Sequence, residues 1–299
     1  RMSSQERDVV VLDGGMATEL EAAGKVLPKD LWSGGLLFTD PSSVRDAHLR
    51  FLQAGSDVVT TISYQLHVDN LLARGLPQDE VEKILKLSVE LAKEAVALNK
   101  EDNKRVAVSC GPYGAILSDG SEYRGNYGLS EEDLFKFHKR KMDILSTGGG
   151  DLIAAETIPD FNEIKALCSL LPSYNTPWWL SLQCQDGKTL ADDTPLSEVI
   201  TFLTPLSLGG LVAVGVNCCS PLVANEALQE IRKINKKIPL IAYPNQGGVW
   251  NAETKTWEKN QGRPISSFVG EWVQMGVTYI GGCCCVLSAE IGEIRQTVH

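Results

Sequence analysis

The sequence has no hydrophobic run long enough to cross a membrane. Its longest apolar stretches, such as residues 208–216, are far shorter than the roughly 18 consecutive residues that indicate a membrane-spanning helix. Residues 1–8 are mostly polar and lack the apolar core of a secretory signal. We therefore expect a cytoplasmic protein with no membrane partner, whose cysteines are kept reduced.

Positive charge is also scarce. The chain has 28 Lys and Arg residues against 38 Asp and Glu residues, which gives a formal net charge of −10 at pH 7. Binding to nucleic acid or to anionic lipid requires clustered cations that neutralise phosphates. The acidic balance argues against a nucleic-acid partner and favours a small-molecule ligand.

The chain has no low-complexity linker, no internal repeat and no change of composition along its length. Its 299 residues are 43% hydrophobic, which is sufficient for one sizeable core. We therefore expect residues 1–299 to form one domain.

Short apolar runs rich in β-branched residues alternate with amphipathic stretches of helical period. The expected strands span residues 9–12, 57–62, 105–109, 151–155, 178–182, 211–216, 239–242 and 277–280. The expected helices span residues 42–54, 78–99, 131–147, 161–171, 196–203, 224–235, 265–275 and 287–298. This alternation and length are typical of a (β/α)8 TIM barrel. An open doubly wound sheet would usually carry a glycine-rich phosphate-binding motif, which the sequence lacks.

Three long segments without clear periodicity follow expected strands. They span residues 22–39, 111–129 and 247–263. In a barrel, segments that follow strands lie at the C-terminal face, where active sites are found. These segments are therefore candidate lids.

Cysteines gather where two of the expected strands end. Cys218 and Cys219 follow the sixth strand, and Cys283, Cys284 and Cys285 follow the eighth. In a parallel barrel these strand ends meet at one mouth, so thiols far apart in the sequence can lie together. Three thiolates with an open fourth position suit a tetrahedral catalytic Zn²⁺.

Other roles for the cysteines fit their spacing less well. Free cysteine is often a small buried hydrophobe, but a doublet and a triplet at two strand ends are unusual for that role. An iron–sulfur cluster with Cys285 as a fourth ligand lacks the close cysteine spacings typical of such clusters. Disulfides are disfavoured because neighbouring cysteines pair poorly with each other and the expected compartment is reducing.

A set of short motifs runs through nearly the whole chain. Residues 215–218 are Gly-Val-Asn-Cys and residues 281–284 are Gly-Gly-Cys-Cys. Residues 12–16, 55–61 and 120–125 and the pair Glu156-Thr157 accompany them. In this order the motifs resemble the zinc-dependent homocysteine S-methyltransferase family, which includes betaine-homocysteine methyltransferase and the homocysteine module of cobalamin-dependent methionine synthase.

The resemblance implies roles for individual residues. The zinc ligands correspond by position to Cys218, Cys283 and Cys284. The residues that hold the amino and carboxylate groups of homocysteine correspond to Asp13, Gly14, Thr61 and Glu156. Asn245 matches a position that can give the metal an oxygen ligand before the thiol binds. Cys219 and Cys285 depart from the family pattern as extra neighbours of the ligands, and either could compete for the metal.

Some of these residues also have plainer interpretations. Asp13 could cap the turn that follows it, and Glu156 could pair with an internal Lys or Arg. Only one of Thr60 and Thr61 need be functional, since threonine is common in strands. Trp32 could be a core residue, or it could close over a donor cation through a cation–π contact of about 0.5–2 kcal/mol.

The resemblance implies transfer of a methyl group to the thiol of homocysteine, which gives methionine. The expected donor is S-methylmethionine, with S-adenosylmethionine as a weaker substitute, because an anionic zinc–thiolate centre attracts a sulfonium cation. Betaine is the alternative donor. Relatives that use betaine carry a long C-terminal extension that builds their oligomer, whereas this sequence ends soon after its last helix. This difference favours S-methylmethionine over betaine as the expected donor, and we expect a monomer.

Two other classes of function remain open. A zinc-barrel hydrolase would use His and Asp ligands to activate water, but the sequence has four His and none ends an expected strand. A non-catalytic thiol or metal sensor would explain the cysteines but not the accompanying Asp13, Thr61 and Glu156.

Overall fold

The computed structural model describes residues 9–28, 31–246, 249–251, 256–258 and 263–298. Among these residues, no helix is both long enough and apolar enough to span a bilayer.

The centre of the molecule is a sheet of eight parallel strands. They are β1 (Val10–Val11), β2 (Val58–Thr60), β3 (Arg105–Cys110), β4 (Leu152–Ile158), β5 (Trp178–Leu182), β6 (Leu211–Asn217), β7 (Leu240–Tyr243) and β10 (Val277–Ile280). Their spatial order is β1-β10-β7-β6-β5-β4-β3-β2. A parallel bridge between Leu12 and Val58 joins the chain after β1 to β2, so the sheet curls back on itself. The predicted (β/α)8 barrel is confirmed.

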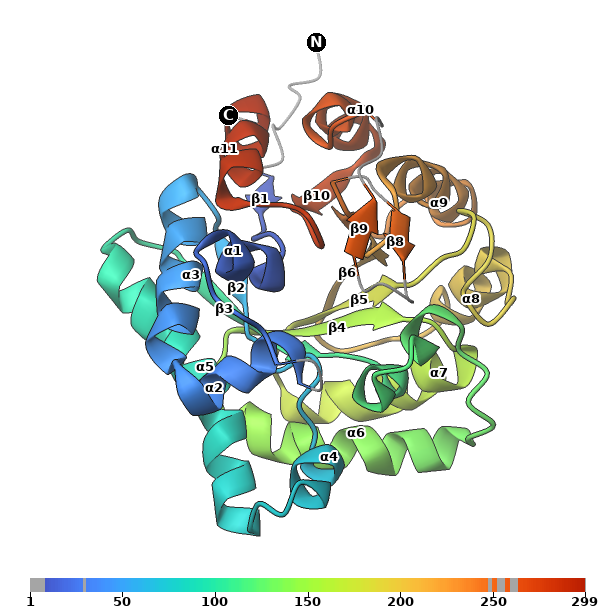
Figure 1. Cartoon of the computed structure of the whole chain (residues 1–299). Coiled ribbons are helices and arrows are strands. Elements are labelled where there is room, and N and C mark those ends of the chain that lie inside the picture. The colour runs from blue at the N-terminus through green and yellow to red at the C-terminus, as the bar shows by residue number, and fades with distance from the viewer. Residues whose placement is uncertain (1–8, 29–30, 247–248, 252–255, 259–262, 299) are drawn as a thin grey trace.

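Eight longer helices surround this barrel (Figure 1). They are α3 (Pro41–Ala54), α5 (Gln78–Asn99), α6 (Glu131–Leu145), α7 (Phe161–Leu170), α8 (Leu196–Leu203), α9 (Pro221–Ile234), α10 (Ser266–Met275) and α11 (Ser288–Val298). The last of them, α11, packs against α3 and closes the ring. The helices therefore cover the outside of every strand and leave the two ends of the barrel open to loops.

Local sequence signals explain where several helices begin. Asp40 caps α3 by accepting a hydrogen bond from the Ser43 N–H, with Pro41 in the first turn. Ser130 and Asp133 form a capping box at the start of α6. Ser220 caps α9, which begins at Pro221, three residues before the predicted start. The side-chain oxygens of these residues satisfy backbone N–H groups that would otherwise lack partners.

Several short elements lie outside the predicted strands and helices. They are α1 (Met16–Ala22), α2 (Leu36–Thr39), α4 (Val68–Ala73), the 3₁₀ helices η1 (Trp32–Gly35), η2 (Tyr113–Leu117) and η3 (Ser121–Tyr123), and the hairpin strands β8 (Val249–Asn251) and β9 (Thr256–Glu258). Two more 3₁₀ turns, η4 (Ser146–Gly148) and η5 (Leu171–Tyr174), extend α6 and α7. The prediction failed here because one or two turns are too short to show a period, and Gly15 gives α1 no side-chain cap.

The barrel interior changes from apolar to polar along the strands. One cluster of buried side chains fills its lower part and includes Ala107, Ala154, Trp179 and Ile241. Side chains two positions further along a strand point to the same side of the sheet. This alternation brings a set of polar side chains into the C-terminal mouth: Thr60, Ser109, Glu156, Ser181 and Tyr243.

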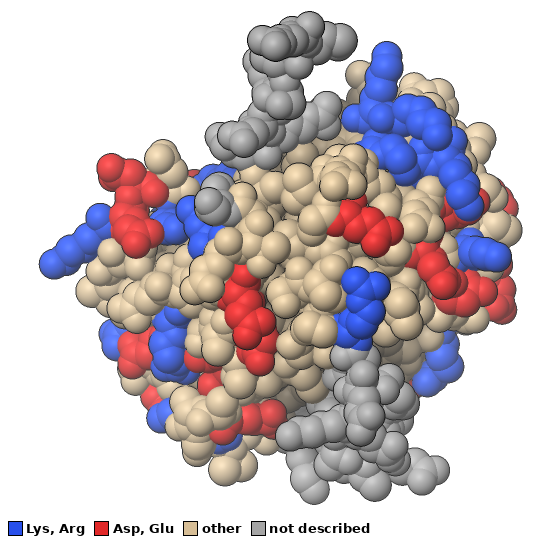
Figure 2. Space-filling model, turned by 90° about the horizontal axis from the view of Figure 1, so that it is seen from above, with Lys and Arg blue, Asp and Glu red and all other residues tan. Residues whose placement is uncertain are grey.

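The surface carries charges of both signs. On the face shown in Figure 2, acidic and basic side chains both occur, with uncharged surface between them. On α6, Lys136 pairs with Glu132 and Lys139 pairs with Asp143, each four residues apart. Such exposed pairs make small contributions to stability, about 0.3–0.5 kcal/mol each.

Candidate active site

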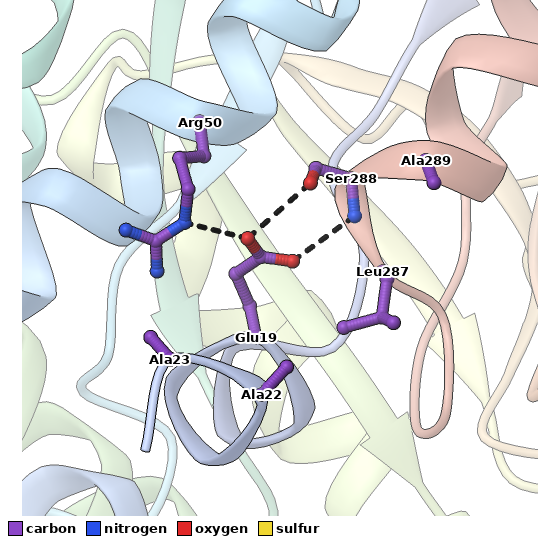
Figure 3. Close-up of a pocket in the computed structure, with 7 residues that line it drawn as sticks. All are labelled: Glu19, Ala22, Ala23, Arg50, Leu287, Ser288 and Ala289. Carbon is purple, nitrogen blue, oxygen red and sulfur yellow. Dashed lines mark hydrogen bonds and ion pairs between the residues drawn. The ribbon is translucent and has the colours of Figure 1, made fainter. Parts of the chain in front are cut away.

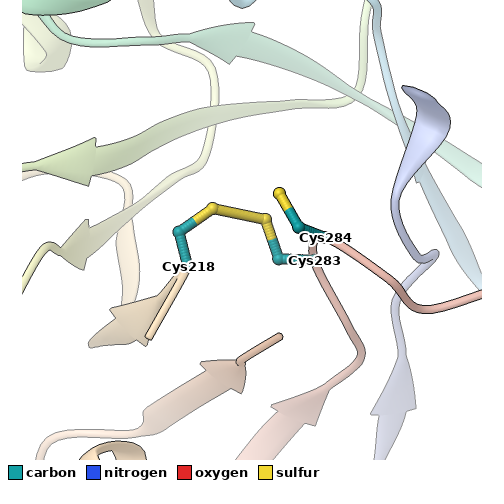
Figure 4. Close-up of side chains that lie close together, drawn as sticks. All are labelled: Cys218, Cys283 and Cys284. Atoms are coloured by element: carbon teal, nitrogen blue, oxygen red, sulfur yellow. A yellow bond between two sulfur atoms is a disulfide. The ribbon is translucent and has the colours of Figure 1, made fainter. Parts of the chain in front are cut away.

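Three cysteine sulfurs from two strand ends lie together at the mouth of the barrel (Figure 4). The Sγ atoms of Cys218, Cys283 and Cys284 all lie within 4.8 Å of one another. Thiolates at zinc–sulfur distances of about 2.3 Å in a tetrahedral site lie about 3.8 Å apart. The three side chains therefore fit a tetrahedral metal after small adjustments.

Cys218 and Cys283 form a disulfide in this structure, with their Cα atoms 5.6 Å apart (Figure 4). The expectation of no disulfide considered cysteines that are neighbours in the sequence, whereas the barrel brings the ends of β6 and β10 together. Cys284 keeps a free thiol. A disulfide offers no thiolate to a metal, so the disulfide and a three-thiolate metal site are alternative states of the same sulfurs.

Backbone hydrogen bonds hold the two cysteine segments beside the chain after β7. The Cys283 N–H donates to the Pro244 carbonyl at 2.8 Å, and the Asn245 N–H donates to the Cys219 carbonyl at 2.8 Å. Asn245, predicted as an oxygen ligand, is 6% exposed, and its Oδ1 accepts the Cys284 N–H at 3.1 Å. Its amide therefore positions the backbone of Cys284 in this structure, and its role as an oxygen ligand stays a prediction.

The two extra cysteines lie outside this group of three sulfurs. Cys219 packs in the apolar layer of the main core. Cys285 is partly exposed at a φ of +63°, and its N–H donates to Thr18 Oγ1 at 3.0 Å. Among the residues that the structure describes, the sulfur cluster contains only Cys218, Cys283 and Cys284.

The chain after the cysteine triplet is anchored by α1 (Figure 3). Glu19, which is 5% exposed, accepts hydrogen bonds from Arg50 Nε at 2.6 Å and from the Ser288 N–H at 3.0 Å. The Ser288 hydroxyl donates to the same carboxylate at 3.3 Å. A pocket opens beside this network, lined by Glu19, Ala22, Ala23, Arg50, Leu287, Ser288 and Ala289. Glu19 thus caps α11 and fixes the end of the cysteine segment.

Asp13 lies buried at the mouth, next to the end of β2. Its carboxylate accepts the Thr60 N–H at 2.7 Å and the Thr60 hydroxyl at 3.2 Å. Burial raises the pKa of Asp13 to about 8, and these hydrogen bonds oppose the shift. A cationic ligand group placed here would favour the ionised carboxylate.

Glu156 is the second buried carboxylate of the mouth. Its Oε1 accepts the Ser109 hydroxyl at 2.5 Å, and its Oε2 accepts the Tyr243 hydroxyl at 3.1 Å. Tyr243 in turn accepts the Trp179 indole N–H at 3.0 Å. Burial raises the pKa of Glu156, while these donors and the charge of Lys141 oppose the shift. The carboxylate is therefore held in one orientation by two neutral donors, one from β3 and one from β7.

An internal cation was the plainer explanation for Glu156, and Lys141 is the buried candidate. Lys141 is 2% exposed, and its Nζ donates to the Ser63 carbonyl at 2.6 Å. Within the described part of the chain, Glu156 forms no ion pair closer than 4 Å. Lys141 instead fixes the segment after β2, and a ligand cation remains a suitable partner for Glu156.

Thr60 and Thr61 have different environments. Thr60 contacts Asp13, as described above. Thr61 is 3% exposed; its hydroxyl accepts the Ser109 N–H at 2.9 Å and lies 2.8 Å from the Ser63 hydroxyl. In this structure the Thr61 hydroxyl bonds within the protein, and its contact with substrate stays a prediction, while Thr60 orients a carboxylate of the mouth.

Gly14 and Trp32 were also predicted to contact substrate. A Cβ at Gly14 would lie 2.5 Å from the Val286 carbonyl oxygen and 2.9 Å from Phe51 Cε1. Close packing against the cysteine segment therefore requires glycine at this position. Trp32 is half-buried at the start of η1 with a φ of +47°, and its contact with a donor cation stays a prediction.

Several residues of the mouth were not among the predicted site residues. Thr60, considered only as an alternative to Thr61, orients Asp13, and Tyr243 orients Glu156. Asn217 links two strands by accepting the Ser181 hydroxyl at 2.6 Å and donating to the Thr157 hydroxyl at 2.7 Å. Gln183 is 7% exposed, and its Oε1 has no hydrogen-bond partner. The alternation of side chains from Trp179 through Ser181 could have placed Gln183 in the mouth.

These features define a (β/α)8 barrel with a candidate thiolate metal centre beside two buried carboxylates. The chain belongs to the homocysteine S-methyltransferase family, whose sequence model matches residues 10–298. This match confirms the predicted family and the prediction that the protein is an enzyme of that family.

Individual relatives match over nearly their full length. A homocysteine S-methyltransferase of Escherichia coli (strain K12) is 38% identical over 298 residues, covering 97% of this chain and 95% of that protein. A selenocysteine Se-methyltransferase of Brassica oleracea var. italica is 37% identical, covering 96% of this chain and 88% of that protein. The metallated form of the homocysteine methyltransferase MmuM from E. coli matches with a TM-score of 0.85 at 37% identity, covering 97% of this chain and 96% of that chain.

Proposed function

We propose that this protein transfers a methyl group from a sulfonium donor to the thiol of homocysteine, which gives methionine. The preferred donor is S-methylmethionine, and S-adenosylmethionine is a weaker one. The single observation that carries this proposal is the cluster of the Cys218, Cys283 and Cys284 sulfurs beside two buried carboxylates in a barrel of this family.

The three thiols suit Zn²⁺, because soft sulfur ligands at tetrahedral spacing favour this metal. The metallated form of the E. coli relative supports a metal in the family. When bound here, zinc would lower the pKa of the acceptor thiol and keep it as a nucleophilic thiolate at neutral pH. Cys218 and Cys283 must first be reduced, which agrees with our expectation of a cytoplasmic location.

The chain's own residues would hold the amino-acid end of homocysteine. Glu156 is oriented by Ser109 and Tyr243, and Asp13 is oriented by Thr60. Both are buried carboxylates that gain from a positive partner. In the proposed complex they bind the substrate ammonium, which places the substrate thiol toward the cysteines. Alignment of the two reactants then lowers the barrier to methyl transfer.

An assay of methyl transfer tests the proposed function. Reduced, zinc-loaded protein is incubated with homocysteine and each of S-methylmethionine, S-adenosylmethionine and betaine, and methionine is quantified by mass spectrometry. We expect S-methylmethionine to give the highest kcat/KM and two molecules of methionine per donor consumed, since both the donor and the acceptor become methionine. Betaine as the best donor would overturn the choice of donor, and no transfer from any donor would overturn the proposed function.

The Glu156→Gln variant is expected to keep its metal but to raise the KM for homocysteine by about tenfold or more. The reason is the loss of a charge-assisted hydrogen bond, which contributes about 1.5–3 kcal/mol. Steady-state kinetics with a varied homocysteine concentration measures the change, and a short thiol without an amino group serves as the comparison acceptor. If the variant and the wild type use homocysteine equally well, Glu156 has a structural role only.

A further inference from the structure

Another buried carboxylate, Glu122, is not used by the proposed mechanism. It lies in η3, in the segment between β3 and α6 that is green in Figure 1. Its side chain is 7% exposed, and its Oε2 is buried without a hydrogen-bond partner. An ionised carboxylate in such a place is unfavourable unless a cation or donors compensate for the lost water. One oxygen of the Glu122 carboxylate therefore lacks a partner, which a ligand could supply.

Glu122 belongs to the same end of the barrel as the cysteine cluster. Its segment follows β3 and therefore lies at the C-terminal end of the barrel, where the cysteine segments also lie. Burial raises the pKa of the Tyr64 and Tyr123 phenols and of the Cys284 thiol, and the negative charge of Glu122 adds to each of these shifts. Tyr64 follows β2 and Tyr123 adjoins Glu122 in the chain, so two aromatic side chains share this region with the carboxylate. Carboxylates and aromatic rings are the groups that attract sulfonium and quaternary ammonium cations in proteins.

The nearest cation in the segment is engaged elsewhere. Arg124 donates to the Asp119 carbonyl at 3.2 Å and to the Ser121 hydroxyl at 3.1 Å, and it pairs with the Asp119 carboxylate at 3.7 Å. In the described residues, Glu122 forms no ion pair with a Lys, Arg or His. The negative charge of Glu122 is thus not neutralised by a direct contact from the protein.

The position of Glu122 is fixed by close packing. A Cβ at Gly114 would lie 2.4 Å from the Glu122 backbone nitrogen, so η2 and η3 approach each other closely at this point. Ser121, next to Glu122, donates both its N–H and its hydroxyl to the Asp119 carboxylate, at 2.9 and 2.5 Å. A carboxylate on such a segment is preorganised for a ligand.

We infer that Glu122 is the counter-charge for the sulfonium group of the methyl donor, bound on the Cys284 side of the mouth. This inference rests on the proposed function. During transfer, the bond between the donor sulfur and its methyl carbon breaks, and its electron pair stays on the donor sulfur. The homocysteine sulfur forms the new bond to carbon, and the thiol proton has already gone to solvent. The donor sulfur becomes a neutral thioether, so its attraction to Glu122 is lost and product release is favoured.

Binding measurements can separate this role from a structural one. S-methylmethionine and methionine differ by one methyl group and its positive charge. We expect the reduced, zinc-loaded wild type to bind S-methylmethionine more tightly than methionine, as measured by calorimetry. In the Glu122→Gln variant this preference should fall by about tenfold or more, with the methionine affinity, zinc content and Tm close to those of the wild type.

Glu21→Gln is the matched control. Glu21 is an exposed carboxylate that also interacts electrostatically with Cys284, so the variant removes the same charge from the neighbourhood without removing the buried group. We expect it to keep the preference for S-methylmethionine. If Glu21→Gln reduces the preference as much as Glu122→Gln does, the effect comes from net charge and the inference is wrong.

Other outcomes are also decisive. An unchanged preference for S-methylmethionine in Glu122→Gln would overturn the inference. Equal weakening of S-methylmethionine and methionine binding would also overturn it, because this result would indicate a contact with the ammonium group that both ligands share. If Glu122→Gln does not fold, Glu122→Asp replaces it, because this variant keeps the charge and moves it by one methylene. Its preference for S-methylmethionine should fall by less than the tenfold expected for Glu122→Gln, and no fall at all would overturn the inference. A wild type that transfers no methyl group and binds no S-methylmethionine would contradict the proposed function instead.

Discussion

Replacing Cys284 with alanine is expected to abolish both stable zinc binding and methyl transfer. Cys284 is the member of the cluster with a free thiol, so the substitution leaves the Cys218–Cys283 pair in place. A tetrahedral site with one thiolate missing binds zinc far more weakly, because each thiolate supplies a strong bond and a negative charge. Metal analysis of the reduced, zinc-loaded protein should give about one zinc per wild-type chain and almost none per variant chain.

The neighbouring cysteines provide matched controls. Cys285→Ala removes the next thiol in the sequence, and Cys219→Ala removes one that packs in the apolar core. Both variants should keep most of their zinc and activity, since neither sulfur belongs to the cluster. A full zinc content in Cys284→Ala, or an iron–sulfur absorption spectrum in the wild type, would contradict the proposed metal site.

Substitution of Gly14 by alanine is expected to destabilise the protein by about 3 kcal/mol or more and to weaken zinc binding. The new Cβ would meet the Val286 carbonyl oxygen at 2.5 Å and Phe51 Cε1 at 2.9 Å. The first neighbour is backbone, so the overlap is relieved only by moving the chain that follows Cys283–Cys285. Urea denaturation measures the loss, and the rate of zinc release to a chelator reports the displaced cysteines.

Gly270→Ala on α10 is the control for this prediction. No atom lies within 4 Å of a Cβ at that position, and the residue is exposed in the helix. The variant should keep its zinc and gain up to about 1 kcal/mol of stability, since alanine is the better helix former. Equal stability of Gly14→Ala and the wild type would show that the segment after β1 adapts to a side chain.

The barrel could be predicted from the sequence because its period is repeated in every βα unit. Residues 78–99, 178–182, 196–203 and 277–280 have the predicted bounds of α5, β5, α8 and β10. Each of these segments has a clear period or a short apolar run between turn residues. The elements that were missed, α1 and the β8–β9 hairpin among them, are short, and their positions depend on packing rather than on local propensity.

The candidate site could be predicted only in part. Strand ends placed the cysteines at one mouth, but the choice among Cys218, Cys219 and their neighbours depends on which side of the sheet each side chain takes. The support of Glu156 by Tyr243 joins residues far apart in the chain, and no local pattern predicts such a pair. The motif that contains Glu122 was recognised, yet only the fold shows that its carboxylate is buried without a partner.

The contacts between α1 and the segment after the cysteine triplet have a consequence for the order of folding. Thr18 bonds Cys285 and Glu19 bonds Ser288, so the first helix meets residues 267 and 269 positions later in the chain. β10 must also insert between β1 and β7 before Cys283 reaches Cys218. Contacts of such high sequence separation form late, because closing the long loop costs entropy first. On the ribosome, the proposed metal centre is therefore completed only after the last strand has emerged.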